Sequence, residues 1–402
     1  MTEREFAIDV VRRLRERGYE ALWAGGCVRD EWLGLEPADY DVATNARPGD
    51  VQKLFPRTIA IGAAFGVIDV VGPKVDGQFL SVQVATFRSD GTYTDGRRPD
   101  TVTFGTAEAD AERRDFTVNG LFFDPLENRL IDYVGGQADL QAKLLRAIGN
   151  PIDRFTEDKL RVLRAVRMAT RFDLSIDPAT LEAGRRIAPD IGVVSVERIA
   201  EELRKLLAHP RRGRGGQLLT EWGLVEPIFP ELKGCFTTAI LGALPERAGF
   251  TLALASLLLP IGVRESKRVC LRLKLSTDEL RQVVWLVEHH GSLNAVPELK
   301  ASQLYPVLAH PQSVDLISLH LAAGAARQAE ECERILRETP RERLDPLPLI
   351  TGDDLIAIGW KSGPQFKPIL DAVRAAQLDC EIQTRDQAMQ LAEQLRSTLP
   401  AR

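Results

Sequence analysis

The spacing of apolar residues changes near residue 150, and this change constrains the fold more than any other feature of the chain. Before it, short β-rich runs alternate with glycine-rich turns, and the candidate strands are residues 20–24, 40–44, 66–71, 80–87 and 129–133. Beyond it, helical periodicity dominates. The candidate helices are residues 157–171, 196–207, 278–288, 313–338 and 364–377. We therefore expect an α+β region followed by an all-α region.

The composition is that of an ordinary globular protein, with 44% hydrophobic and 27% charged residues in a chain of 402. A chain of this length predicts more than one domain. The apolar runs are too short to span a membrane, and the first residues lack the apolar segment of a secretory signal. The five cysteines are scattered without a Cys-x₂-Cys pair, which favours reduced thiols and a cytoplasmic location.

The net charge of −5 argues weakly against a nucleic-acid partner, because proteins that bind nucleic acids usually carry a basic signature. This charge is an average over the whole chain. A local basic patch can still bind a polyanion while the rest of the surface stays acidic.

A glycine pair lies between the first predicted strand and a short predicted helix, in the run Gly25-Gly26-Cys27-Val28-Arg29-Asp30. Glycines allow a backbone to approach a ligand closely, and the first turn of a helix offers free N–H groups that suit a phosphate. Arg29 adds a guanidinium that can bind the same group. The alternative is a tight turn in which Arg29 and Asp30 form a surface ion pair.

Two carboxylates follow on the second predicted strand, Asp39 and Asp41. Strand periodicity places both on one face and Tyr40 and Val42 on the other. The two carboxylates would be about 7 Å apart along the strand, which suits a pair of divalent cations. By itself Asp-x-Asp is more often a solvated strand end, but here it follows Arg29 by ten residues, and the combination favours a metal site.

These residues resemble the first motif of the class II nucleotidyltransferases, the family of CCA-adding enzymes and bacterial poly(A) polymerases. Residues 95–99 (Asp-Gly-Arg-Arg-Pro) resemble the flexible loop of the family's catalytic head, and residues 113–119 resemble its Arg-Arg-Asp motif. Residues 157–167 resemble the Glu-Asp-x-x-Arg motif of its neck. Further likeness lies in Gly352-Asp-Asp-Leu355, Gly359-x-x-x-Gly-Pro364 and Gln377-Leu378 near the C-terminus. The motifs keep their order and spacing.

The arginines of the neck motif follow helical spacing. At 100° per residue, Arg161, Arg164, Arg167 and Arg171 fall within an arc of about 120°, with Asp158 just off one edge. A carboxylate beside a guanidinium can bind the edge of adenine or cytosine, whose amino groups donate and whose ring atoms accept. The alternative is a set of ordinary salt bridges between Glu157, Asp158 and Arg161.

The resemblance implies a nucleotidyltransferase-type mixed-sheet head at residues 1–150, a helical neck at 151–215, a body at 216–340 and a tRNA-binding tail at 341–402. It also implies template-independent addition of CCA to tRNA from CTP and ATP. Asp39 and Asp41 would hold two Mg²⁺ ions. The implied nucleotide-binding residues are Gly25, Gly26, Arg29, Arg113, Arg114, Asp158, Arg161, Arg164 and Arg167. Asp115 and Asn119 would hold the junction of head and neck.

Contacts to the RNA backbone are also expected outside the head. The candidates are the cluster Arg211, Arg212 and Arg214 and the loop 360–364, Trp-Lys-Ser-Gly-Pro. The sequence offers no indication of a protein partner.

Two segments depart from the family pattern. Gln83 stands where relatives often have Glu, so the metal assignment is confined to Asp39 and Asp41. Residues 61–67 lack both the His-Gly of many CCA-adding relatives and the Gly-Arg/Lys-Arg-Phe of poly(A) polymerases, and the latter absence favours CCA addition. An A-adding, CC-adding or poly(A)-adding enzyme and a non-catalytic RNA-binding paralogue remain alternatives.

Overall fold

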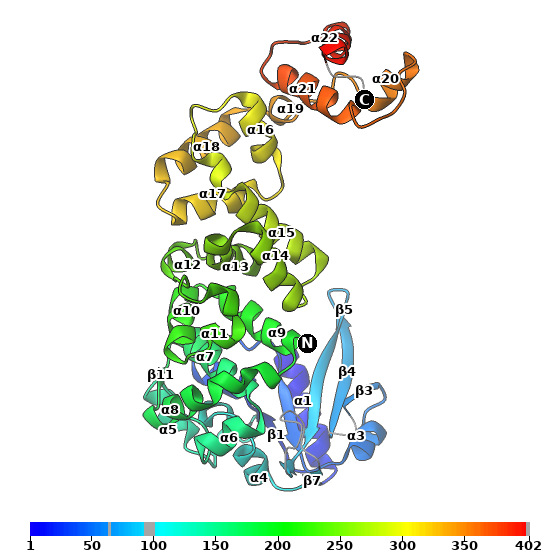
Figure 1. Ribbon diagram of the computed structural model, residues 1–402. Helices are drawn as coiled ribbons and strands as arrows, with labels where there is room; N and C mark the ends of the chain where they lie inside the picture. Colours follow the sequence, from blue (N-terminus) through cyan, green and yellow to red (C-terminus); the bar gives the residue numbers. More distant parts are fainter. Residues whose placement is uncertain (63–65, 92–100, 399–402) are drawn as a thin grey trace. The chain divides into compact units, whose positions relative to one another are not determined.

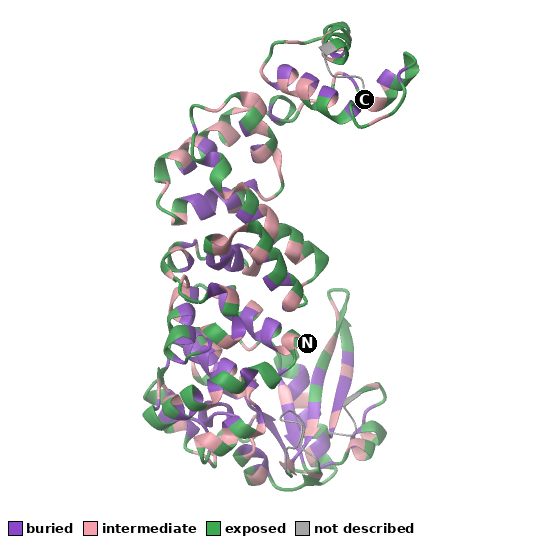
Figure 2. Cartoon of the chain, viewed as in Figure 1, coloured by how far each residue is buried: buried purple, intermediate pink, exposed green. Residues whose placement is uncertain are grey.

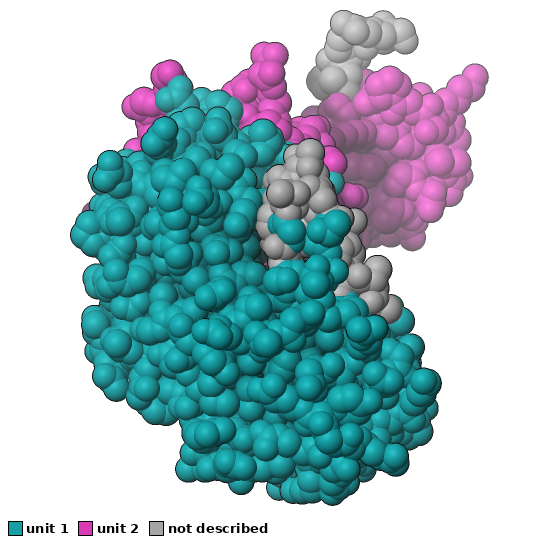
Figure 3. All heavy atoms as spheres, turned by 90° about the horizontal axis from the view of Figure 1, so that it is seen from below, with its two compact units in different colours: residues 1–206, 217–230 teal, residues 207–216, 231–402 magenta. Residues whose placement is uncertain are grey.

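The computed structural model describes residues 1–62, 66–91 and 101–398, which form two compact units (Figures 1 and 3). The first comprises Met1–Leu206 and Gln217–Pro230, and the second comprises Leu207–Gly216 and Glu231–Arg402. The expected head and most of the expected neck share the first unit. The division into head, neck, body and tail stays a prediction.

The first unit contains a seven-stranded sheet in the order β3-β4-β5-β2-β1-β8-β9. Only β2 and β5 pair in parallel, and the other neighbours are antiparallel. The strands are β1 Ala21–Ala24, β2 Asp41–Thr44, β3 Thr58–Gly62, β4 Val67–Val75, β5 Gln78–Thr86, β8 Leu121–Asp124 and β9 Arg129–Asp132. All five predicted strands are therefore present, and β3 and β8 were not predicted. The short strands β6 Arg88–Asp90 and β7 Val102–Phe104 pair separately.

One face of this sheet is covered by the first helix, α1 Glu3–Glu16, which packs on β1, β2 and β5. Its apolar stripe of Phe6, Ala7, Val10, Val11 and Leu14 is buried. The alternation in β5 buries Val82 and Val84 and leaves Ser81 and Gln83 exposed. Figure 2 shows this banding of buried and exposed residues along the β4–β5 hairpin. The second face of these central strands therefore carries the polar side chains.

Helices make up most of the rest of the first unit, together with a two-stranded parallel sheet of β10 Leu144–Leu145 and β11 Ser175–Ile176. The helices are α2 Gly26–Trp32, α3 Pro48–Leu54, α4 Ala107–Glu112, α5 Gly136–Gln141, α6 Pro151–Glu157, α7 Leu160–Phe172, α8 Pro178–Ile187, α9 Val196–Leu207 and α11 Val225–Ile228, while α10 Arg212–Glu221 belongs to both units. The predicted single helix 157–171 was wrong at its start. Asp158 has φ −146° and ψ 102°, so it separates α6 from α7.

The described part of the second unit is helical. Its helices include α12 Ala239–Ala243, α13 Phe250–Leu258, α14 Gly262–Arg272, α15 Thr277–His289, α16 Ala301–Ala309, α17 Ser313–Ala322, α18 Ala326–Glu338, α19 Arg341–Leu344, α20 Gly352–Ala357, α21 Phe366–Leu378 and α22 Arg385–Thr398. The predicted helix 313–338 is divided between α17 and α18 by Gly324, whose φ of 90° cannot continue a right-handed helix. The mixed-sheet region followed by a mainly helical region confirms the predicted fold class. None of the described helices is long and apolar enough to cross a membrane.

Two side chains that were expected to contact RNA are buried inside the protein. Arg212 is 1% exposed, and its guanidinium donates to backbone carbonyls that include those of Leu207, Pro245 and Ala248. Arg212 therefore joins segments of its own unit, and its assignment to RNA was wrong. Trp360 is buried in the core of the C-terminal helices, with its ring edge-on to Phe366.

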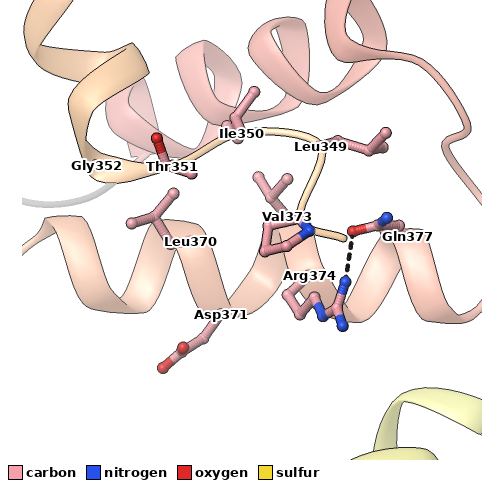
Figure 4. A pocket seen from close by; sticks show the side chains of 10 residues that line it. Leu349, Ile350, Thr351, Gly352, Leu370, Asp371, Val373, Arg374 and Gln377 are labelled. Carbon is pink, nitrogen blue, oxygen red and sulfur yellow. Dashed lines mark hydrogen bonds between the residues drawn. The ribbon is translucent and has the colours of Figure 1, made fainter. Parts of the chain in front are cut away.

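The C-terminal helices also enclose a pocket of about 360 Å³ between α21 and the segment before α20 (Figure 4). Arg374 donates to Gln377 and Asp345, and Gln377 donates to the Leu347 carbonyl. These bonds attach α21 to the segment that precedes α20. Gln377, which belongs to the predicted C-terminal motif, therefore has a structural role.

Candidate nucleotidyltransferase site

The carboxylates Asp39 and Asp41 lie at the start of β2, on the side of the sheet opposite α1. Asp39 is exposed and Asp41 is half-buried. Tyr40, which lies between them, and Val42, which follows Asp41, are buried. The strand itself begins at Asp41, one residue later than predicted. Burial and the charge of Asp39 raise the pKa of Asp41 to about 6, against the opposing charge of Arg114.

This carboxylate pair fits a divalent cation. The two side chains bring hard oxygen ligands and an excess of negative charge to one place, which Mg²⁺ favours. Gln83 is the residue of β5 that pairs with Asp41 in the parallel register. The carboxylate that relatives often have at this position would point toward the same place, and the amide of Gln83 contributes no charge. The described residues include no cluster of three or more potential ligands among His, Cys, Asp and Glu.

The glycine pair lies beside an arginine that the sequence pattern did not associate with it. Gly25 has φ 74°, and a Cβ built on it would lie 2.6 Å from Nη1 of Arg114. Arg114 donates from the same nitrogen to the Asn119 carbonyl at 3.2 Å. The absence of a side chain at Gly25 thus allows the Arg114 guanidinium to lie against the turn that precedes α2.

Arg113 and Arg114 are held by a carboxylate that we did not predict, Asp110 of α4. Arg113 donates to one oxygen of Asp110 at 2.6 and 2.9 Å, and Arg114 donates to the other at 2.9 and 3.2 Å. Burial alone would raise the pKa of Asp110, but the charges of Arg114 and Arg113 outweigh it and lower this pKa. The helical spacing of three and four residues was the available signal.

Asp115 and Asn119 connect the motif to the neck, as expected. Asp115 accepts from Arg164 through Nε at 2.9 Å and Nη2 at 2.7 Å, and also from the Asn119 amide at 2.9 Å. Burial would raise the pKa of Asp115, but the charge of Arg164 and these hydrogen bonds hold it well below its usual range.

Asp158 is paired with an arginine that lies 40 residues further along the chain. Arg198, on α9, donates to both oxygens of Asp158 at 3.2 and 2.7 Å. The Leu160 backbone N–H donates to the same carboxylate at 3.1 Å. Arg161 binds Glu157 at 2.6 Å instead and donates to the carbonyls of Arg154 and Arg113. Of the salt bridges in the alternative interpretation, the one between Glu157 and Arg161 is present, whereas Asp158 forms its ion pair with Arg198.

Six of these side chains nevertheless line one pocket of about 230 Å³. They are Arg113, Arg114, Asp115, Asp158, Arg161 and Arg164. Four guanidinium groups and two carboxylates give the lining a formal charge of +2. Its size and charge suit an anionic ligand that also presents hydrogen-bonding edges.

Arg29 and Arg167 are not part of this lining. The Arg29 side chain is buried, lies over the Phe172 ring and donates to Asp30 and Asn119. Burial lowers the pKa of Arg29, and the charge of Asp30 opposes this shift. Arg167 donates to Glu202 and is only 11% exposed. Both guanidinium groups are therefore directed to protein carboxylates or amides.

The expected flexible loop at residues 95–99 lies outside the described residues. The motif at 61–67 lies partly outside them as well, since residues 63–65 are not described. Both interpretations stay predictions.

Comparison with known proteins agrees with this arrangement. Residues 21–146 match the family description "Poly A polymerase head domain", and residues 173–235 match "Probable RNA and SrmB- binding site of polymerase A". The chain is 34% identical over 392 residues to a CCA-adding enzyme of Geobacillus thermodenitrificans, covering 94% of this chain and 93% of the relative. It is 39% identical over 248 residues to poly(A) polymerase I of Salmonella typhi, covering 58% of this chain and 51% of that protein.

The fold is likewise similar to a solved structure, that of the Bacillus stearothermophilus CCA-adding enzyme in complex with CTP. The TM-score is 0.81 at 28% identity, with 99% of this chain and 98% of the other covered. The likeness to CCA-adding relatives therefore extends over nearly the whole chain. The chain belongs to the class II nucleotidyltransferase family, which comprises the CCA-adding enzymes and the bacterial poly(A) polymerases.

Proposed function

We propose that this enzyme adds C, C and A in turn to the 3′ end of tRNA, using CTP and ATP and releasing pyrophosphate at each addition. The observation that carries this proposal is the extent of the likeness. Relatives named CCA-adding enzymes align over 94% of the chain, whereas the alignment to poly(A) polymerase I covers 58%. The related Bacillus stearothermophilus enzyme was solved with CTP.

In this proposal Asp39 and Asp41 hold two Mg²⁺ ions. When bound, the cations would activate the tRNA 3′-hydroxyl and neutralise the charge of the departing pyrophosphate. The placement of both carboxylates at the start of β2, where the charge of Asp39 acts on the half-buried Asp41, supports this assignment. Gly25 and Gly26 leave room at the turn before α2, where Arg114 supplies positive charge for the triphosphate.

The pocket of Arg113, Arg114, Asp115, Asp158, Arg161 and Arg164 would hold the incoming nucleotide. Asp158 can accept a hydrogen bond from the amino group of cytosine or adenine. Uracil and guanine present a carbonyl oxygen at the corresponding edge, which a carboxylate repels. Because Arg198 donates to both carboxylate oxygens, the Asp158 side chain is held in one orientation for this selection.

Arg29 and Arg167 have a supporting part in this scheme. Arg29 orders Asn119, and Asn119 in turn donates to Asp115 beside the pocket. Arg167 anchors α7 to α9 through Glu202. We propose that both residues position the nucleotide-binding groups without contacting the nucleotide.

The decisive assay measures incorporation of labelled CTP and ATP, separately and together, into three RNAs. These are tRNA ending at the discriminator base, tRNA ending at CC, and a generic RNA. Addition that stops after C, C and A, and is lost in Asp39→Ala, is expected. Addition of A alone to the CC-ended tRNA would make this an A-adding enzyme, and addition that stops at CC would make it a CC-adding enzyme. Long A tails on all three RNAs would make it a poly(A) polymerase.

A further inference from the structure

The exposed face of the central sheet continues from the carboxylates toward the tip of the β4–β5 hairpin. Residues paired across neighbouring strands share a face, and Gln83 pairs with both Asp41 and Asp69. Strand alternation puts Ser81 and Phe79 on the same face as Gln83. Phe79 therefore lies four residues, or about 13 Å, along β5 from the position beside Asp41.

An aromatic ring flanked by two cations lies at this end of the hairpin. Phe79 is 55% exposed. The Arg57 guanidinium carbon is 5.3 Å from the ring centroid, and the Lys74 ammonium nitrogen is 5.8 Å from it. Arg57 is further held by a 3.0 Å hydrogen bond to the Gly72 carbonyl. Figure 2 shows the turn that joins β4 to β5 as exposed.

This cluster has the chemistry of a single-stranded RNA site. Its two cations have no acidic partner within the described ranges, so both are available to phosphates. An exposed aromatic ring offers a face on which a base can stack, whatever its identity. Stacking of a ring against bases and attraction of cations to phosphates are the two elements of sequence-independent binding. A chain with a net charge of −5 has no general attraction for RNA, so a local cationic site of this kind is needed.

We propose that Phe79, Arg57 and Lys74 form a docking surface for the single-stranded 3′ end of the RNA acceptor. The proposal rests on the proposed function. If the 3′-hydroxyl of the acceptor lies at Asp39 and Asp41, the nucleotides that precede it must extend away from these carboxylates along the protein surface. The surface is continuous with those carboxylates on one sheet face. It binds the acceptor and leaves CTP and ATP to the arginine pocket.

The test measures binding of tRNA that ends at CC, and so keeps an unpaired 3′ end, without CTP or ATP, by fluorescence anisotropy at several salt concentrations. Phe79→Ala is expected to raise Kd about fivefold or more. Arg57→Ala combined with Lys74→Ala is expected to raise Kd and to reduce the dependence of log Kd on log salt by about 0.7 per lost phosphate contact. Matched controls on other parts of the unit are Lys53→Ala on α3 and Leu126→Ala in the β8–β9 turn, both expected to bind as the wild type does.

A further variant is expected to change Kd in the opposite direction, which makes the test more specific. Asp76 lies in the hairpin turn with φ 49°, a conformation that asparagine also tolerates. Asp76→Asn removes a negative charge near Lys74 and is expected to lower Kd. Steady-state assays of all variants should show a raised KM for tRNA in Phe79→Ala, with the KM for CTP and ATP unchanged.

Wild-type Kd values for Phe79→Ala and for the double variant would overturn the proposal, as would equal losses in the two controls. Because binding is measured without nucleotide, the result does not depend on which nucleotides the enzyme adds. If the wild-type enzyme adds only A, the proposed function is refuted, but the comparison of Kd values between the variants and the wild type still tests the docking surface. A wild type that adds CCA, with variants that bind normally, would refute the docking surface alone.

Discussion

Arg164 of α7 donates two hydrogen bonds to a single carboxylate oxygen of Asp115, at 2.9 and 2.7 Å. The carboxylate is buried, and it also accepts from the Asn119 side chain. This pair joins α7 to the segment that carries Arg113 and Arg114, and both Asp115 and Arg164 line the pocket of four arginines. The geometry of the pocket therefore depends on the stability of the pair.

Asp115→Asn is expected to lower the free energy of unfolding by about 2 kcal/mol at pH 7. The loss is smaller than for a fully buried pair because 37% of the Arg164 side chain is exposed. The pKa of Asp115 is lowered by folding, so its contribution is complete above the unfolded pKa of about 3.9 and declines as pH falls further. Urea unfolding at pH 7, 5 and 3 should give equal differences from wild type at pH 7 and 5, and a smaller one at pH 3. An undiminished difference at pH 3 would contradict the assignment.

Gly25→Ala is expected to reduce nucleotide addition by at least about tenfold, because its Cβ would displace the Arg114 guanidinium 2.6 Å away. Gly18→Ala is the matched control. Gly18 has φ 81° and open space around it, so both variants carry similar backbone strain, roughly 1–2 kcal/mol. A comparison of kcat/KM and thermal stability between the two variants distinguishes the effect of backbone strain from the effect of displacing Arg114. Equal activities in the two variants would show that the position of Arg114 is unimportant.

Asp158→Asn is expected to lower kcat/KM for CTP and ATP by about tenfold and to reduce discrimination against UTP and GTP. An amide can turn its N–H₂ toward the carbonyl of uracil or guanine, which the carboxylate cannot. The measurement is incorporation of each of the four nucleotides into CCA-lacking tRNA. Asp153→Asn changes an exposed carboxylate on α6 and should leave the preference as it is. An unchanged ratio of CTP to UTP use in Asp158→Asn would remove Asp158 from base selection.

Gln83→Glu is expected to strengthen divalent-cation binding about fivefold, since one more carboxylate beside Asp41 adds roughly 1 kcal/mol of attraction after solvent screening. Titration with Mn²⁺ followed by electron paramagnetic resonance reports this without any catalytic step. Gln78→Glu places the same charge at the far end of the same strand and serves as the control. Equal Mn²⁺ affinity in the two variants would place the cations away from Gln83.

Local periodicity located the strands and helices that were predicted, although many short elements were not predicted. The predicted helix 196–207 coincides with α9, and all five predicted strands are present. Errors arose where one residue interrupts a regular pattern. Gly324 and Asp158 each interrupt a helix that the apolar spacing alone would continue. Gly324 does so through a positive φ, and Asp158, which is held by the distant Arg198, does so through an extended backbone.

The sequence by itself determined the family, predicted a metal-binding role for Asp39 and Asp41, and located the motif that supplies the arginines. Their partners were decided only by the tertiary structure. Arg198 reaches Asp158 across 40 positions, Arg164 reaches Asp115 across 49, and the β4–β5 pairing brings Lys74 to Phe79. The physical reason is that the spacing of residues within one helix or strand specifies the face on which a side chain lies. The oppositely charged partner of that side chain lies on another helix or strand, so the spacing does not identify it. Which arginines line the pocket and which, like Arg212, are buried among carbonyls therefore followed only from the packed chain.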